Sequence, residues 1–311
     1  MRAVSPQSAR AALDTAAGLL GPLAARDRPL GELTTYRVGG RAALYSEPGT
    51  VADLERLATA VRSSGIEVVV VGKGSNLLVA DSGFPGLCVR LGEGFSGIAI
   101  EGELVRAGGA VAYPVLARRT AAAGLTGLEW AVGIPGSVGG AVRMNAGGHG
   151  SQTSDVLCDC RVVSLLGGAE HLIEAGALDL SYRHSTIGPH DVVTEACYRL
   201  AHGDAEQSAA RIDEIVRWRR EHQPGGQNAG SVFTNPPGDA AGRLIEQAGL
   251  KGLRIGSAEV SERHANFIQA DPGGSADDVK RLIEKVRALV AERLGVELHT
   301  ELRLIGFEEG S

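Results

Sequence analysis

Residues 133–148 read Gly-Ile-Pro-Gly-Ser-Val-Gly-Gly-Ala-Val-Arg-Met-Asn-Ala-Gly-Gly. Glycine at this density does not suit the interior of a helix or strand, because it costs more conformational entropy to order than other residues. Pro135 stiffens the stretch, and Ile134, Val138 and Val142 supply apolar anchors. We therefore expect a rigid loop that lies against a large ligand, rather than a flexible linker.

A second glycine loop lies upstream, where residues 71–77 read Val-Gly-Lys-Gly-Ser-Asn-Leu. It follows a β-branched run at 68–71, which is typical of a buried strand. Successive backbone amides in such a turn can form a concave anion site. The loop lacks the third glycine of a Rossmann fingerprint and the Gly-Lys-Ser/Thr of a P-loop. Together the two loops indicate a diphosphate ligand held between glycine-lined surfaces.

Composition limits the remaining possibilities. The chain has 311 residues, of which 43% are apolar and 22% are charged, and its formal charge is −6. It can bury a core, and its length suggests two domains at about 150 residues each. The acidic balance argues against a general nucleic-acid binder. No apolar run reaches the length of a membrane span, and residues 15–25 make a poor signal peptide. We expect a soluble cytoplasmic protein without membrane insertion.

The pattern of apolar residues predicts an α+β fold with many short strands. Expected helices cover 51–63, 111–123, 204–222 and 240–249, with a further helix capped by Ser275. Expected strands cover 68–71, 77–79, 87–91, 98–107, 156–166, 191–200 and 296–305. A change of composition near residue 205 indicates a domain boundary.

The four cysteines are Cys88, Cys158, Cys160 and Cys197. They form no Cys-x-x-Cys pair and have no histidine at zinc spacing, so no metal site is expected. We expect buried, reduced thiols.

Six ordered motifs resemble those of the UDP-N-acetylenolpyruvoylglucosamine reductase (MurB) family. They are the two glycine loops together with Thr35–Gly40, Ser181–Ser185, Gly230–Pro236 and Thr300–Gly306. The length of the chain is similar to that of the shorter subclass.

The resemblance implies a vanillyl-alcohol-oxidase-like (PCMH-type) FAD-binding domain of two α+β subdomains and a C-terminal α+β substrate-binding domain. The expected boundaries are 1–30 for an N-terminal helical extension, 31–204 for the FAD-binding domain and 205–311 for the substrate-binding domain. The family uses NADPH and non-covalent FAD to reduce UDP-N-acetylglucosamine enolpyruvate to UDP-N-acetylmuramate for peptidoglycan synthesis. Ping-pong kinetics and a monomer or weak dimer are expected, with no nucleic-acid partner.

Three residues match the family's catalytic positions. Arg183 could pair with the substrate carboxylate and stabilise the anion that develops there. Ser231, placed after a glycine, could protonate the strongly basic carbanion. Glu301 would assist the same intermediate, and we expect it to be partly desolvated.

The binding predictions follow the same motifs. The cofactor-binding residues are predicted to be Val71, Gly72, Lys73, Gly74, Ser75, Asn76, Leu77, Gly133, Ile134, Pro135, Gly136, Ser137, Gly139, Gly140, Ala141, Asn145, Ala146 and Gly147. The substrate residues are predicted to be Tyr182, Asn235, His222 and His264. His222 stands where the family often has lysine, and Thr234 replaces another common lysine, so the arginines of 217–220 are further candidates for the diphosphate.

Two alternatives remain open. A related oxidase could hold its flavin covalently, with His149 as the attachment point. A nucleotide-binding protein without catalysis would keep the glycine loops but would not need the three catalytic side chains.

Overall fold

The computed structural model describes residues 6–307 and divides into two compact units. Among the described residues, the first unit comprises 6–27, 43–73 and 85–218, and the second comprises 28–42, 74–84 and 219–307. The division differs from the expected boundaries at 30 and 204. The helix expected at 204–222 belongs mostly to the first unit, and two upstream segments join the second.

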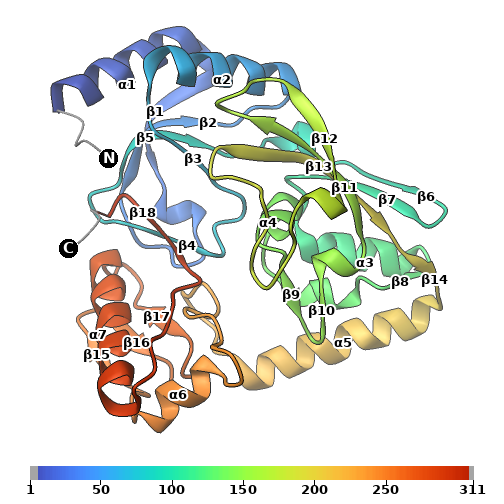
Figure 1. Cartoon of the computed structure of the whole chain (residues 1–311), viewed down its shortest axis with the longest axis vertical. Helices are drawn as coiled ribbons and strands as arrows, with labels where there is room; N and C mark the ends of the chain where they lie inside the picture. Colours follow the sequence, from blue (N-terminus) through green and yellow to red (C-terminus); the bar gives the residue numbers. More distant parts are fainter. Residues whose placement is uncertain (1–5, 308–311) are drawn as a thin grey trace. The chain divides into compact units, whose positions relative to one another are not determined.

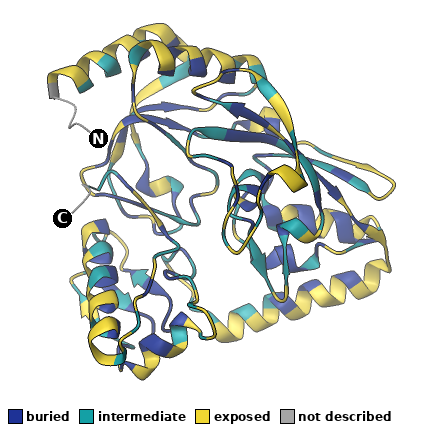
Figure 2. Ribbon diagram, in the orientation of Figure 1, coloured by how far each residue is buried: buried dark blue, intermediate teal, exposed yellow. Residues whose placement is uncertain are grey.

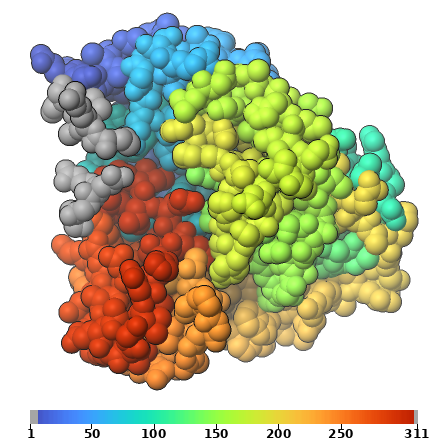
Figure 3. All heavy atoms as spheres, in the orientation of Figure 1, coloured from blue at the N-terminus to red at the C-terminus, as the bar shows by residue number. Residues whose placement is uncertain are grey.

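The amino-terminal part of the first unit pairs two helices with a sheet. Helices α1 (Pro6–Leu20) and α2 (Val51–Ser64) run side by side on its surface (Figures 1 and 3). The side-chain oxygen of Thr50 accepts from the Asp53 amide and caps α2, which ends at Gly65 with a φ of 67°. A four-stranded sheet has the order β1-β2-β5-β3. Its strands are β1 (Ala24–Pro29), β2 (Arg41–Ser46), β3 (Val68–Val70) and β5 (Phe84–Val89).

The expected N-terminal helical extension is therefore helical only in part. Residues 24–29 form a strand of this sheet. Ala16 and Leu20 of α1 are buried in the same core cluster as Leu54 and Leu57 of α2. Helix α1 is thus packed into the first unit instead of extending from it.

A five-stranded antiparallel sheet completes the first unit, in the order β12-β11-β13-β7-β6. Its strands are β6 (Ile98–Glu101), β7 (Leu104–Gly108), β11 (Leu157–Ser164), β12 (Glu170–Glu174) and β13 (Asp191–Arg199). Helices α3 (Tyr113–Ala122) and α4 (Val138–Arg143) share its apolar core, which appears as buried ribbon in Figure 2. The single strand expected at 98–107 is a hairpin that turns at Gly102, where φ is 60°.

The second unit surrounds the long helix α7 (Ala276–Leu294). The Ser275 hydroxyl accepts from the Asp278 amide at 3.2 Å, as the predicted cap requires. Its other elements are α6 (Ala241–Gln247), β4 (Leu77–Val79), β15 (Arg254–Ile255), β16 (Ala258–Val260), β17 (Ile268–Ala270) and β18 (Arg303–Ile305). Strands β4 and β18 pair in parallel, with Arg303 opposite Leu77.

The strand expected at 296–305 was predicted too long. Only 303–305 forms a ladder, and Thr300 makes an isolated bridge to Phe233. Within this ladder, Leu304 is 41% exposed while Ile305 is buried. The pairing with β4, rather than a continuous pattern, sets the orientation of these last residues.

The remaining elements are short, apart from helix α5 (Ala205–His222). The short strands are β8 (Leu125–Thr126), β9 (Gly147–Gly148), β10 (Ser151–Gln152) and β14 (Ala201–His202), and the 3-10 helices cover 21–23, 31–33, 93–95, 129–133, 153–155 and 175–177. Within residues 6–307, none of the helices combines the length and apolar character needed to cross a membrane. The predicted burial of thiols is confirmed for Cys88, Cys160 and Cys197, whereas Cys158 is partly exposed.

Candidate functional site

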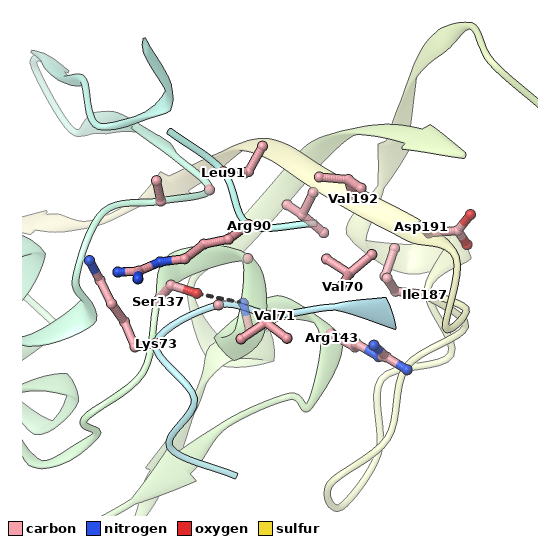
Figure 4. Close-up of a pocket in the computed structure, with 16 residues that line it drawn as sticks. Val70, Val71, Lys73, Arg90, Leu91, Ser137, Arg143, Ile187, Asp191 and Val192 are labelled. Carbon is pink, nitrogen blue, oxygen red and sulfur yellow. Dashed lines mark hydrogen bonds between the residues drawn. The ribbon is translucent and has the colours of Figure 1, made fainter. Parts of the chain in front are cut away.

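A pocket in the first unit brings the two glycine loops together (Figure 4). Of the residues predicted to bind a cofactor, Val71, Gly72, Lys73, Ser137, Gly139 and Gly140 line it. The sequence analysis did not include its other lining residues, which are Val70, Arg90, Leu91, Gly109, Ala110, Arg143, Ile187, Asp191, Val192 and Val193. The lining thus adds the ends of β5, β7 and β13 to the two loops.

Close backbone approach shapes the pocket wall. A Cβ atom at Gly72 would lie 2.5 Å from the Ser137 hydroxyl, and one at Gly109 would lie 1.9 Å from the Val193 carbonyl oxygen. Real Cβ contacts are not that short. Gly109 therefore requires glycine, because its neighbour is backbone, whereas a side chain at Gly72 would have to displace the Ser137 hydroxyl. Gly109 could have been found in the sequence, because it stands between a predicted strand and a predicted helix as the other loop glycines do.

Charge in the pocket favours an anionic ligand. Lys73, Arg90 and Arg143 line it together with one carboxylate, that of Asp191. Figure 4 shows Lys73 and Arg90 at one end of the pocket and Arg143 and Asp191 toward the other. The Asp191 side chain also accepts a hydrogen bond from the Gly188 amide at 2.9 Å. Cationic side chains beside a glycine-lined wall are suited to a diphosphate.

Asn145, in the second loop, does not line the pocket but holds neighbouring backbone in place. It is fully buried, its amide nitrogen donates to the Ser181 carbonyl at 2.9 Å, and its oxygen accepts from the Ser154 amide at 2.9 Å. Its φ is 38°, a region that asparagine tolerates better than most residues. Its structural contribution is therefore to hold the segment that leads into Tyr182.

The remainder of the second loop lies outside the lining of this pocket. These predicted residues are Gly133, Ile134, Pro135, Gly136, Ala141, Ala146 and Gly147. Among them, the Gly147 carbonyl accepts from the Arg183 guanidinium.

The end of the first loop, Gly74–Leu77, belongs to the second unit. Gly74 has a φ of 65°, and its carbonyl accepts from the Thr35 amide at 3.1 Å. Asn76 donates from its side chain to the Glu301 carbonyl at 3.2 Å, and its own carbonyl accepts from the Arg303 amide. Ser75 lies between these fixed residues, and Leu77 begins β4. This part of the loop is therefore tied to the motif at residues 300–306.

Arg183 and Tyr182 are held in the first unit. The Arg183 guanidinium donates to the Gly147 carbonyl at 3.0 Å and lies over the Tyr182 ring, with its central carbon 5.2 Å from the ring centroid. Its φ is 56°, a strained value for a long side chain. Tyr182 is 54% exposed. The structure thus orients a guanidinium and leaves an aromatic ring accessible beside it.

Ser231 and Glu301 lie in the second unit, on two segments that pair with each other. The Glu301 amide donates to the Val232 carbonyl at 2.8 Å, next to the bridge between Phe233 and Thr300. Gly230, with a φ of 77°, makes the turn before Ser231. Both Ser231 and Glu301 are half-buried, as expected for Glu301.

The remaining substrate predictions have different surroundings. The Asn235 side-chain oxygen accepts from the Ala241 amide at 3.0 Å at the start of α6, while its amide group remains available as a donor. His264 is half-buried beside the Phe267 ring, and burial lowers its pKa. His222 ends α5 and is exposed.

Comparison with known proteins gives a consistent result. A family model described as FAD binding domain matches residues 42–172, and one described as UDP-N-acetylenolpyruvoylglucosamine reductase, C-terminal domain, matches residues 222–305. A reductase of that name from Rubrobacter xylanophilus is 45% identical, covering 92% of this chain and 97% of its own. One from Heliobacterium modesticaldum is 44% identical, covering 92% and 91%.

The chain belongs to the UDP-N-acetylenolpyruvoylglucosamine reductase family.

A solved structure agrees with this assignment. The crystal structure of UDP-N-acetylenolpyruvylglucosamine reductase from Thermus caldophilus has a TM-score of 0.79 and 37% identity, covering 89% of this chain and 97% of that one. The α+β fold with a PCMH-type FAD-binding domain is thereby confirmed. The first unit fits this cofactor, because its pocket offers glycine-lined walls and cationic side chains to a dinucleotide diphosphate.

Proposed function

We propose that the protein uses NADPH and non-covalently bound FAD to reduce UDP-N-acetylglucosamine enolpyruvate to UDP-N-acetylmuramate, a step of peptidoglycan synthesis. The observation that carries the proposal is the pairing of the Ser231 segment with the Glu301 segment through the Glu301 amide, in a chain of this family. This pairing places a hydroxyl that can donate a proton and a carboxyl group on two adjacent, hydrogen-bonded segments.

The cofactor would occupy the pocket of the first unit. Gly72, Gly109 and Gly139 would let the backbone approach it, and Lys73 and Arg90 would neutralise its diphosphate. When bound, FAD provides a hydride carrier between the nicotinamide and the enolpyruvyl group. The protein's own residues then have to orient the substrate and supply a proton.

The reduction adds a hydride to the terminal enolpyruvyl carbon and a proton to the adjacent carbon. The two electrons come from NADPH, which leaves as NADP⁺. As the hydride arrives, an electron pair develops on the adjacent carbon and spreads into the substrate carboxylate. Arg183 would bind that carboxylate, and its fixed guanidinium would stabilise the charge most where it grows.

Ser231 would deliver the proton. Serine is a weak acid in water, but the carbanion that it would meet is strongly basic, so transfer from Oγ is favourable. Glu301 would help to stabilise the same intermediate. Tyr182, Asn235, His222 and His264 are proposed to contact the UDP-sugar.

The covalent alternative receives less support from the structure. His149 packs edge-on against Trp218, with ring centroids 5.2 Å apart, and is not among the residues that line the pocket. Acid denaturation distinguishes the two, because non-covalent flavin separates from the protein and covalent flavin precipitates with it.

The decisive experiment measures where deuterium from the solvent enters the product. In D₂O, NADPH oxidation should depend on the enolpyruvyl substrate, and the product should carry one solvent deuterium at the carbon that bears the carboxylate. The terminal carbon should also gain solvent deuterium, because the hydrogen on a reduced flavin nitrogen exchanges with water before it is transferred. Substrate-independent turnover, or a product without deuterium at the carbon that bears the carboxylate, would contradict the proposal. We further propose that NADPH and substrate compete for one site, that the enzyme is a cytoplasmic monomer or weak dimer, and that its kinetics are ping-pong.

A further inference from the structure

Asn266 makes a two-point contact with the backbone that follows Ser231. The Phe233 amide donates to Asn266 Oδ1 at 3.0 Å, and Asn266 Nδ2 donates to the Phe233 carbonyl at 2.8 Å. The Val232 amide donates to the backbone carbonyl of Asn266 at 2.9 Å. Asn266 is only 3% exposed, so water does not replace these bonds easily.

The same backbone also fixes Glu301. The Val232 carbonyl accepts from the Glu301 amide at 2.8 Å, and Asn76 donates to the Glu301 carbonyl from the other side. Ser231 directly precedes Val232. A displacement of Val232 and Phe233 would therefore move Ser231 and Glu301 together.

Only a carboxamide side chain can bond to both the backbone N–H and the backbone C=O of Phe233 in this way. Its oxygen accepts from the N–H while its nitrogen donates to the C=O, so the side chain acts like one rung of a β-ladder. Alanine would leave both backbone groups of Phe233 without their partners. Since these groups are buried, the segment would shift to find others.

We infer that Asn266 is a positioning residue, which holds Ser231 and Glu301 in the geometry that proton delivery requires. The inference rests on the proposed function. Asn266 touches neither reactant in this role, so its loss should slow the step that needs Ser231 and spare the steps that do not.

The test uses the FAD-loaded enzyme under anaerobic conditions and separates the two halves of the reaction. Flavin absorbance follows first the reduction by NADPH, and then reoxidation by the enolpyruvyl substrate. For Asn266→Ala we expect reduction by NADPH within about 3-fold of wild type, unchanged substrate affinity, and reoxidation slower by on the order of 10²-fold, the usual effect of a displacement of about 1 Å.

The matched control is Asp278→Asn. Asp278 is also a buried polar residue of the second unit, and it accepts from the Ser257 amide at 2.7 Å, away from Ser231 and Glu301. This variant should lose stability while keeping the wild-type rate of reoxidation. If Asn266→Ala does not fold, Asn266→Ser, which keeps a hydroxyl in the cavity, replaces it.

A double-mutant cycle distinguishes positioning from a general structural role. If Asn266 acts through Ser231 and Glu301, adding Asn266→Ala to a background that carries both Ser231→Ala and Glu301→Ala should slow reoxidation by no more than about 3-fold. An equal drop in both backgrounds, an equal loss in the NADPH step, or wild-type reoxidation in Asn266→Ala would overturn the inference. Failure of the wild-type enzyme to be reoxidised by the substrate would instead overturn the proposed function.

Discussion

Gly72 and Ser137 meet at the wall of the flavin pocket, and each limits the space available to the other. A Cβ atom at Gly72 would lie 2.5 Å from Ser137 Oγ but 3.6 Å from Ser137 Cβ. The first distance is a clash and the second is ordinary van der Waals contact. Gly72→Ala should therefore be costly beside Ser137 and nearly neutral in a Ser137→Ala background.

The magnitude follows from what Ser137 does. It is buried, and its hydroxyl accepts from the Gly140 amide at 3.3 Å to cap α4. In Gly72→Ala, the Ser137 hydroxyl would have to move away from the new Cβ atom. The loss of its cap on α4 should lower the stability of the fold by about 1 kcal/mol, and overpacking of the pocket wall should lower it by roughly a further 1–3 kcal/mol. Ser137→Ala alone should cost about 1 kcal/mol. The coupling energy between the two substitutions should thus be roughly 2–4 kcal/mol.

Two measurements on the four proteins test this cycle. Urea unfolding gives the stability of the flavin-free forms, and quenching of flavin fluorescence gives their affinity for FAD, where a tenfold change is about 1.4 kcal/mol. Gly140→Ala is the control, because its Cβ would meet only the Ser137 hydroxyl, at 3.4 Å. An equal cost of Gly72→Ala in both backgrounds would refute the clash as its cause.

Three further predictions concern other parts of the chain. Ser231→Ala should leave reduction of the flavin by NADPH nearly intact and slow its reoxidation by substrate by orders of magnitude, and equal losses in both steps would make the serine structural. Burial alone would raise the pKa of Glu129, but hydrogen bonds from Ser208 and Thr126 outweigh it and hold the pKa below its ordinary value of 4.5. The ionised carboxylate therefore stabilises the fold above that pH, and this contribution disappears as the pH falls further. Glu129→Gln should cost about 1 kcal/mol in urea at pH 7 and cost less in acid, where an undiminished cost would contradict this origin. Finally, a disulfide reagent should modify Cys158 first in the native protein, because the other three thiols are buried; faster modification of any of those would contradict the packing.

Much of the fold could be predicted from local pattern. The helices at 51–64, 113–122 and 276–294 agree with their apolar spacing, and the last also with its Ser275 cap, because those signals are local to each segment. The strand at 296–305 was predicted too long, because only residues 303–305 pair with β4 while Leu298 and Leu302 are buried without a continuous ladder. Pairing between segments more than 200 residues apart leaves no periodic signal in either one.

In the candidate site, too, local motifs could be predicted from the sequence, whereas contacts between distant segments could not. The two glycine loops were identified from sequence, and six of their residues line the pocket. Arg90 and Asp191 were not predicted, since each lies at the end of an ordinary strand. Only the folded structure brings them beside the two glycine loops. Asn266 was missed for a related reason, because its partners at 232 and 233 lie more than 30 residues away.

We propose above that a flavin bound in the first unit reduces an enolpyruvyl UDP-sugar with electrons from NADPH. The most direct measurement is the visible spectrum of the purified protein, recorded anaerobically before and after addition of NADPH and then of UDP-N-acetylglucosamine enolpyruvate. We expect yellow protein that bleaches with NADPH and regains its colour only with the substrate. Protein that stays colourless after incubation with FAD, or that bleaches and is not restored by the substrate, would contradict it.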